Sequence, residues 1–326
     1  MTSQLWGQSE AIRQLGARTH TLSQLSVLLD QELSSAVSMK IALVTGCSSG
    51  LGKALARALH TGSWSASNSQ RFRVFATARR LQDMEDLRLE GIDVLQLDVT
   101  DASSVQSTVD RVVGEAGGID LLVCNAGMIR YGPLVEQELS DIKAIFDTNV
   151  FGTLLCARAV APVMIKQRSG IIAASGSISA RLTAPFVGAY SASKSATQSL
   201  FEGLRVEMSP YNVAVTVIEA GIFRSDLTQK STLDISKYTA ESSLWRQAAT
   251  RIAYTAKYIK ENPTTTAEQV AAHVAKQLCR KQGPPAHFLV GEETWVTKFA
   301  GFIYTFISPH LIHKVLAGRF GLDKKW

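Results

Sequence analysis

The stretch KIALVTGCSSGLGKALARAL, residues 40–59, joins a short apolar run to a helical one through a glycine-rich turn. Residues 41–45 predict a buried strand, and the apolar spacing of residues 53–59 predicts a helix. Three glycines occupy the turn between them, Gly46, Gly50 and Gly52. A helix N-terminus favours an anion, and glycine lets a phosphate group approach the backbone closely. The pattern therefore predicts a phosphate-binding turn, with a purely structural turn as the alternative.

The composition fits an α/β protein. The chain has 326 residues, 46 % of them apolar, which is enough for one large domain or two small ones. Helical and strand-like runs alternate from about residue 40 to 290, as in a domain with a parallel sheet. The formal net charge is +6, but the basic residues are scattered, so we predict no nucleic-acid partner. This mild basicity suits an anionic ligand or an anionic membrane surface.

The cysteines and the apolar runs argue against several kinds of protein. Four cysteines occur without CxxC spacing, which predicts free thiols in a reducing, intracellular compartment. Histidine, cysteine and acidic residues are not grouped as metal ligands, so no metal site is predicted. Because no run of 18 or more apolar residues is present, no membrane-spanning helix is predicted.

Two arginines follow the second predicted strand, which lies in RFRVFATARR, residues 71–80. Sites for NAD place an acidic residue after this strand to bind the ribose 2′-hydroxyl, and none occurs from Val74 to Gln82. Arg79 and Arg80 stand there instead. Since a guanidinium matches a phosphate, the pair predicts NADP(H) as the cofactor. The alternative is that both arginines are solvated loop residues.

Two further strands lead into polar residues within reach of a ligand. One is predicted over residues 92–97 and ends at Asp98, and another lies in GIDLLVCNAG, residues 118–127, and leads to Asn125. Ligands bind at the carboxyl ends of parallel strands. Asp98 and Asn125 are therefore candidates to contact an adenine and its ribose, although both residue types are also common in turns and helix caps.

The remaining pattern completes a doubly wound sheet. A long helical region over residues 139–167 contains Asn149, a poor residue for a helix interior that needs buried hydrogen-bond partners. Another helix is predicted to end near Met208. Further strands are predicted over residues 170–179, 213–218 and 286–290. We therefore expect a single α/β domain with a seven-stranded, mostly parallel sheet.

The sequence YSASK, residues 190–194, places Tyr190 one helical turn before Lys194. A free phenol has a pKa of about 10, far above neutral pH. A neighbouring ammonium favours the phenolate, and such a phenol can exchange a proton with a substrate. The alternative is a hydrogen-bonding pair on a surface helix.

Taken in order, these motifs resemble the short-chain dehydrogenase/reductase family over residues 40 to about 291. The motifs are TGCSSGLG at 45–52, NAG at 125–127, Asn149, Ser177 and YSASK at 190–194. The resemblance implies a Rossmann domain in which Tyr190 is the general acid of carbonyl reduction and the base of alcohol oxidation. It implies that Lys194 favours the phenolate and binds the nicotinamide ribose, while Ser177 steadies the substrate oxygen. It also implies that Asn149 holds a water that links Lys194 to solvent.

The same resemblance implies cofactor-binding residues beyond Tyr190 and Lys194. They are Gly46, Ser48, Ser49, Gly50, Leu51, Gly52, Arg79, Arg80, Asp98, Asn125, Arg158, Phe223 and Ser225. The glycine-rich turn would hold the pyrophosphate, and for Arg158 a surface role is the alternative. The family usually has a proline where this chain has Ala220, which predicts a less rigid loop around Phe223 and Ser225.

The chain is expected to have three segments. Residues 1–38 are predicted to be a poorly ordered N-terminal extension, residues 39–291 the Rossmann domain with a substrate cap at 226–263, and residues 292–326 an apolar tail. The apolar run of the tail, residues 299–307, is too short to span a bilayer. It is expected to lie in a membrane interface or cover a lipid-like substrate, or else to pack in the core or a dimer.

The predicted function is NADP(H)-dependent reduction of a carbonyl group, or oxidation of an alcohol, on a small lipophilic substrate. The tail and the motifs resemble fungal NADPH-dependent 1-acyldihydroxyacetone-phosphate reductases. The alternatives are a ketoreductase or dehydrogenase of a secondary-metabolite, steroid or retinoid pathway, and a non-enzymatic cofactor-binding scaffold. We expect an intracellular protein, cytoplasmic or held at the endoplasmic reticulum or lipid droplets by its tail. A homodimer or homotetramer is expected because the family commonly forms them.

Overall fold

The computed structural model describes residues 39–65, 70–224, 233–261, 263–292, 309–319 and 322. The chain divides after Met39, and every element named below belongs to the unit from Lys40 to Trp326. Three predictions lie outside the described residues: the extension over 1–38, the apolar run over 299–307, and Ser225.

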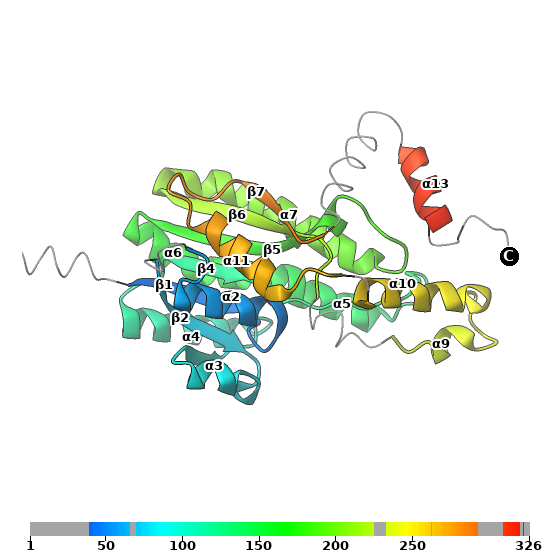
Figure 1. Cartoon of the computed structure of the whole chain (residues 1–326), viewed down its shortest axis with the longest axis horizontal. Helices are drawn as coiled ribbons and strands as arrows, with labels where there is room; N and C mark the ends of the chain where they lie inside the picture. The colour runs from blue at the N-terminus through cyan, green and yellow to red at the C-terminus, as the bar shows by residue number, and fades with distance from the viewer. Residues whose placement is uncertain are drawn as a thin grey trace, which may run out of the picture. The chain divides into compact units, whose positions relative to one another are not determined.

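One parallel sheet forms the centre of the described part of the chain. Its seven strands run in the order β3-β2-β1-β4-β5-β6-β7 (Figure 1). The strands are β1 (Lys40–Thr45), β2 (Phe72–Ala78), β3 (Asp93–Gln96), β4 (Leu121–Cys124), β5 (Gly170–Ser177), β6 (Val213–Ala220) and β7 (His287–Val290). Each neighbouring pair is parallel, so all carboxyl ends lie at one edge. The predicted doubly wound, seven-stranded sheet is confirmed.

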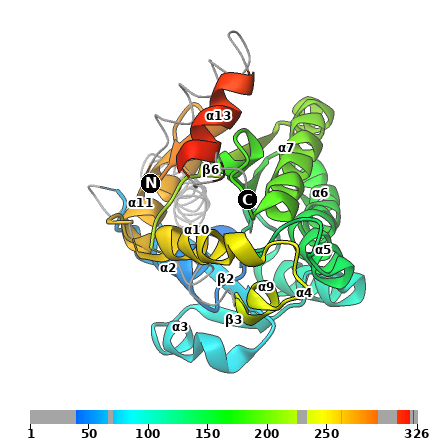
Figure 2. The same cartoon turned by 90° about the vertical axis from the view of Figure 1, so that its right-hand side faces the viewer.

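Helices cover both faces of this sheet. The longer ones are α2 (Gly50–Thr61), α4 (Ala102–Ala116), α5 (Leu139–Phe146), α6 (Thr153–Gln167), α7 (Gly188–Met208), α10 (Ala249–Glu261), α11 (Ala267–Leu278) and α13 (Pro309–Arg319), and α3 (Glu85–Leu89) and α9 (Ser236–Thr239) are short. In Figure 2, α2 and α11 lie on one side of the sheet, and α4, α6 and α7 on the other. Short 3₁₀ turns add η1 (Leu81–Met84), η3 (Ile178–Ala180), η4 (Ser209–Tyr211) and η5 (Arg246–Ala248).

Strand β1 is buried on both faces. Its side chains alternate, so that Ala42 and Val44 pack in one buried cluster with Leu55 of α2, while Leu43 packs in a second cluster with Val160 of α6. A strand in the middle of a parallel sheet has this environment because helices cover both sides. The uninterrupted apolar run that predicts this strand follows directly from that burial.

The helical region predicted over residues 139–167 contains a π-helical segment. α5, η2 (Asp147–Gly152) and α6 follow one another, and Asn149 lies in the π-helical part. By length and apolar composition this is the one stretch of the described residues that could cross a membrane, and 50 % of its most apolar window is buried in the protein. Cys156 and Met164 of α6 pack against the sheet, so the stretch is a core helix in this fold.

Two glycines of the turn after β1 let three segments approach one another. Gly46 has φ +73°, and a Cβ there would lie 2.7 Å from Cα of Ala126. A Cβ on Gly52 would collide with the carboxamide of Asn125 and the carbonyl of Gly46. The glycines thus allow the end of β1, the first turn of α2 and the loop after β4 to share one small volume.

We predict that Gly52→Ala lowers the free energy of unfolding by about 1–3 kcal/mol, the usual cost of forcing a methyl group into a packed site. Gly114 of α4 is the matched control, because a Cβ there meets no atom within 4 Å. Gly114→Ala should stabilise the protein by about 0.5–1 kcal/mol, since alanine is the better helix former. Urea unfolding of both variants measures these differences, and equal stabilisation by both would disprove the close approach at Gly52.

Candidate active site

A cavity of about 580 Å³ opens at the carboxyl edge of the sheet. It extends from the glycine-rich turn after β1 to Tyr190 and Lys194 of α7. Residues that end or follow six strands contribute to its lining: Gly46, Arg79, Asp98, Asn125, Ser177 and Ala220. The cavity therefore lies where a doubly wound sheet binds its ligands.

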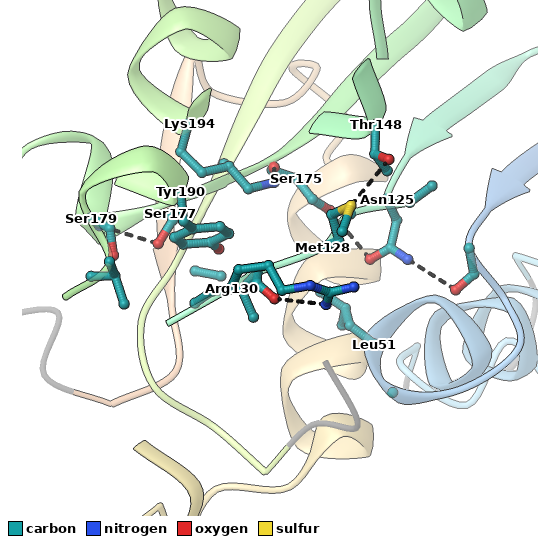
Figure 3. A pocket seen from close by; sticks show the side chains of 18 of the residues that line it. Leu51, Asn125, Met128, Arg130, Thr148, Ser175, Ser177, Ser179, Tyr190 and Lys194 are labelled. Atoms are coloured by element: carbon teal, nitrogen blue, oxygen red, sulfur yellow. Dashed lines mark hydrogen bonds between the residues drawn. The ribbon is translucent and has the colours of Figure 1, made fainter. Parts of the chain in front are cut away.

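The side chains of Ser177, Tyr190 and Lys194 meet in this cavity (Figure 3). Ser177 is the last residue of β5, and the other two lie one turn apart on α7. The Lys194 Nζ lies 5.7 Å from the centre of the Tyr190 ring and donates a hydrogen bond of 2.7 Å to the carbonyl of Ser175. The small residues that surround the pair in sequence, such as the buried Ser193, allow α7 to pack closely at this edge.

Burial controls the ionisation of both groups. It raises the pKa of Tyr190 above its ordinary value, and a hydrogen bond with Ser177 only partly opposes this rise. Burial also lowers the pKa of Lys194 to about 8. The pKa of Tyr190 is thus raised in the protein alone, and the predicted acidification of the phenol by Lys194 stays a prediction. Burial thus shifts each group towards its neutral form relative to water, but a pKa of about 8 leaves Lys194 mostly an ammonium at pH 7.

Asn149 connects two segments of the site by hydrogen bonds. Its Nδ2 donates to the carbonyl of Met128 at 3.0 Å and to Oγ of Ser193 at 2.9 Å, while its Oδ1 accepts from the N–H of Met128 at 2.8 Å. The hydroxyl of Ser193 in turn donates to the carbonyl of Tyr190 at 2.7 Å. Asn149 is fully buried and does not line the cavity. These bonds fix the loop after β4 against the helix that carries Tyr190, and the predicted water relay stays a prediction.

The glycine-rich turn supplies the features of an anion site. Gly46, Ser48, Ser49, Gly50 and Leu51 line the cavity, whereas Gly52 packs beneath it. Gly50 begins α2 with φ +58°, and the first turn of this helix contains no acidic residue. A turn of this shape at a helix N-terminus fits the phosphates of a dinucleotide.

The two arginines after β2 differ in their position relative to the cavity. Arg79 is exposed and lines the cavity. Arg80 lies outside the lining, where its Nε donates to a carboxylate oxygen of Asp83 at 2.9 Å. The structure thus brings Arg79, and not Arg80, to the predicted cofactor site.

Asp98 and Asn125 both line the cavity but differ in their bonds. Burial raises the pKa of Asp98, but hydrogen bonds from the N–H and hydroxyl of Thr100, together with the charge of Arg79, outweigh it and hold that pKa below its ordinary value. Asn125 donates from Nδ2 to the carbonyls of Thr45 and Gly46 at 3.0 and 3.2 Å. Asp98 therefore stays an anion, and Asn125 is a brace between strand ends.

The loop after β6 is held by backbone bonds to the end of β7 and to the residue that follows it by two positions. β6 continues through Ala220, the N–H of Gly221 donates to the carbonyl of Val290 at 2.7 Å, and Ile222 forms an antiparallel bridge with Glu292. The expected loss of rigidity without a proline is therefore offset by these backbone bonds. Phe223 follows the bridge and lines the cavity.

Arg158 is exposed on α6, outside the lining. Several lining residues were not predicted from the sequence, namely Arg130, Tyr258, Leu316 and Arg319. Arg130 follows NAG on the loop after β4, so the rule about strand ends would have found it. Arg319 of α13 donates a hydrogen bond to the hydroxyl of Tyr258 of α10. Because the two residues are far apart in the sequence, no local pattern predicts this contact.

Several relatives match the chain. Dehydrogenase/reductase SDR family member 7B of Xenopus laevis is 33 % identical over 197 residues, covering 58 % of this chain and 59 % of the relative. Estradiol 17-beta-dehydrogenase 1 of Rattus norvegicus is 36 % identical over 199 residues, covering 58 % and 56 %. Both alignments thus span less than two thirds of the relative. The short-chain dehydrogenase cctT of Talaromyces islandicus is 33 % identical over 250 residues, covering 75 % and 84 %.

Solved structures share the fold. A short-chain dehydrogenase from Streptomyces avermitilis superposes with a TM-score of 0.70 at 25 % identity, covering 89 % of this chain and 99 % of that one. A short-chain dehydrogenase/reductase from Burkholderia phymatum in complex with NAD has a TM-score of 0.68 at 21 % identity, covering 84 % and 96 %. One from Burkholderia cenocepacia in complex with NADP has a TM-score of 0.63 at 23 % identity, covering 87 % and 98 %.

The short chain dehydrogenase family itself matches residues 40–236, which contain the glycine-rich turn, the braces and the Ser177, Tyr190 and Lys194 side chains. With the sheet, the cavity and these alignments in agreement, the chain belongs to the short-chain dehydrogenase/reductase family of oxidoreductases.

Proposed function

We propose that this protein uses NADP(H) to interconvert a carbonyl and an alcohol on a lipophilic substrate. The observation that carries the proposal is the meeting of Ser177, Tyr190 and Lys194 in the same cavity as the glycine-rich turn. A binding scaffold would have no use for a phenol and an ammonium buried together beside a serine hydroxyl.

The ionisation of the pair suits a proton donor in reduction. Because burial raises the pKa of Tyr190, the phenol keeps its proton until the substrate oxygen gains negative charge. The hydroxyl of Ser177 would hydrogen-bond that oxygen, and Lys194 would stabilise the phenolate that remains. In oxidation Tyr190 would take the proton back. The nicotinamide, when bound, supplies or accepts the hydride.

Arg79 supports NADP(H) over NAD(H). It is the cation that reaches the cavity after β2, where NAD-specific proteins place an acidic residue. The structures of this fold cited above contain NAD in one case and NADP in another, so the fold by itself accepts both. Of the predicted pair of arginines, Arg79 is the one we assign to the 2′-phosphate.

Apolar residues in the lining of the cavity support a lipophilic substrate. They include Ile129, Leu182, Val187 and Leu316. A 1-acyldihydroxyacetone-phosphate-like compound fits such a lining, and so does a steroid, retinoid or secondary metabolite. The name of the rat relative, an estradiol dehydrogenase, supports the steroid alternative. Action inside the cell, with contact to membranes through the tail and assembly into dimers or tetramers, belongs to the same proposal.

Tyr190→Phe should reduce turnover by about 10²–10⁴-fold, the usual contribution of a general acid, because it removes the proton that the substrate oxygen receives. NADPH binding should be retained. Tyr211→Phe, a change on the exposed η4 turn, is the matched control and should leave turnover unchanged. NADPH consumption with a panel of ketones is the measurement, and equal rates for wild type and Tyr190→Phe would reject the mechanism.

The buried Lys194 should leave a signature in stability. Its pKa is about 8 in the folded chain and 10.5 ordinarily, so the unfolded chain binds the extra proton between these pH values. The buried ammonium therefore destabilises the folded protein most below pH 8. The free energy of unfolding of wild type, relative to that of Lys194→Met, should rise by about 3 kcal/mol as the pH increases from 8 to 10.5. Urea unfolding across this range tests it, with the exposed Lys257→Met as control. A difference that does not change with pH would mean that Lys194 is not desolvated.

Variants of the two arginines after β2 test the cofactor assignment, because only Arg79 lines the cavity. Arg79→Ala should weaken NADPH binding by roughly 10- to 100-fold, the loss of a charge-assisted phosphate contact, and leave NADH binding unchanged. Arg80→Ala should change neither, because Arg80 pairs with Asp83 outside the cavity. Fluorescence titration of both cofactors measures the ratio. A stronger effect at Arg80 would transfer the role to that residue.

A further inference from the structure

The loop after β4 holds Arg130 at a defined place in the cavity. Arg130 follows Met128 by two residues, and both backbone polar groups of Met128 are bonded to Asn149. On its other side, the N–H of Gly132 donates to the carbonyl of Phe186 at 2.9 Å. Further along, Glu136 accepts hydrogen bonds from Ser243 and Leu244 of the cap, at 2.7 and 2.6 Å. The loop is therefore fixed on both sides of Arg130.

The charge of Arg130 is only weakly satisfied within the described part of the chain. Its Nη1 donates to the carbonyl of Ile129 at 3.3 Å, and its Nε lies 3.6 Å from a carboxylate oxygen of Asp141. The side chain of Asp141 is 42 % exposed, and a loose ion pair of this kind contributes little. A guanidinium has five N–H groups, and it cannot lose its charge. Most of its capacity to bind an anion is therefore available to a ligand.

Apolar side chains line the cavity next to the loop that carries Arg130. Ile129 and Val187 form a buried cluster with the ring of Tyr190, and Ala184 packs against it. In Figure 3 the side chain of Arg130 extends into the cavity between Tyr190 and Leu51. A cation on a well-held loop, next to apolar lining and the Tyr190 hydroxyl, matches a ligand that has both an apolar body and an anionic group.

We infer that Arg130 determines substrate specificity by binding a carboxylate or phosphate that the lipophilic substrate carries. The inference rests on the proposed carbonyl–alcohol reaction and deepens it. The planar guanidinium binds either anion through two parallel hydrogen bonds, which also orients the substrate relative to Tyr190. An uncharged substrate of the same shape would bind without this contact, so neutral steroid-type compounds are the poorer class for this cavity.

The other source of an anion in this cavity is the cofactor. The glycine-rich turn and Arg79, at the ends of β1 and β2, are already assigned to its phosphates, whereas Arg130 comes from the loop that Asn149 joins to α7. We therefore assign Arg130 to the substrate. The experiment must separate the two sources.

A long-chain oxo acid and its methyl ester provide the test, because they share the ketone and the chain and differ in one negative charge. At saturating NADPH, wild type should prefer the acid. Arg130→Gln should lower kcat/KM for the acid by roughly 10- to 100-fold, the loss of a charge-assisted pair, and leave the ester unchanged. Arg130→Lys should recover part of the loss. Arg111→Gln, on the outer face of α4 where Arg111 pairs with Glu115, should alter neither substrate.

Two outcomes overturn the inference. If the ratio of kcat/KM for the acid to that for the ester is the same in wild type and Arg130→Gln, Arg130 does not bind the carboxylate. An equal loss for acid and ester, with a higher KM for NADPH, would assign Arg130 to the cofactor. Calorimetric binding of the acid to the NADP(H)-loaded protein gives the same comparison without turnover. If no ketone is reduced while the acid still binds more weakly to Arg130→Gln, the proposed reaction fails and the anion site stands.

Discussion

The carboxamide of Asn125 is the constraint around which the carboxyl edge of the sheet is built. Its Nδ2 bonds to the carbonyls of Thr45 and Gly46, and its Oδ1 accepts a hydrogen bond from Ser175 at 3.3 Å. One side chain thus satisfies polar groups from the ends of β1 and β5 while it follows β4. Buried polar groups without partners are costly, so these strand ends can be placed together only because the bonds are complete. Gly52 is required beside the same carboxamide.

A second asparagine, Asn149, connects this edge of the sheet to the helix that carries Tyr190 and Lys194. It does so by joining the loop after β4 to α7. Tyr190 and Lys194 are both buried, and burial shifts each towards its uncharged form relative to water. Any charge that a ligand brings is felt strongly there, because a low local dielectric leaves it little screened. The site is therefore poised for proton exchange, and it acquires its final electrostatics when cofactor and substrate enter.

Local patterns made most of the fold and the centre of the site predictable. The apolar runs, the spaced glycines and the four-residue interval from Tyr190 to Lys194 are properties of short segments, and the structure has the predicted strand, turn and helices at these places. The fate of Arg80 was not predictable, because its ion pair depends on the η1 turn that brings Asp83 back to it. The position of Leu316 of α13 in the cavity lining was also not predictable from the sequence. Its place in the cavity depends on how distant segments pack, which no periodicity encodes.

The contact between α10 and α13 gives the protein a further property. Tyr258 and Arg319 touch each other and border the same cavity. A molecule that occupies the cavity and contacts both helices favours the conformation in which they are docked, by ordinary thermodynamic linkage. Occupancy of the cavity and docking of α13 against α10 are thereby coupled, and changes in α13 can alter ligand preference while the sheet stays the same.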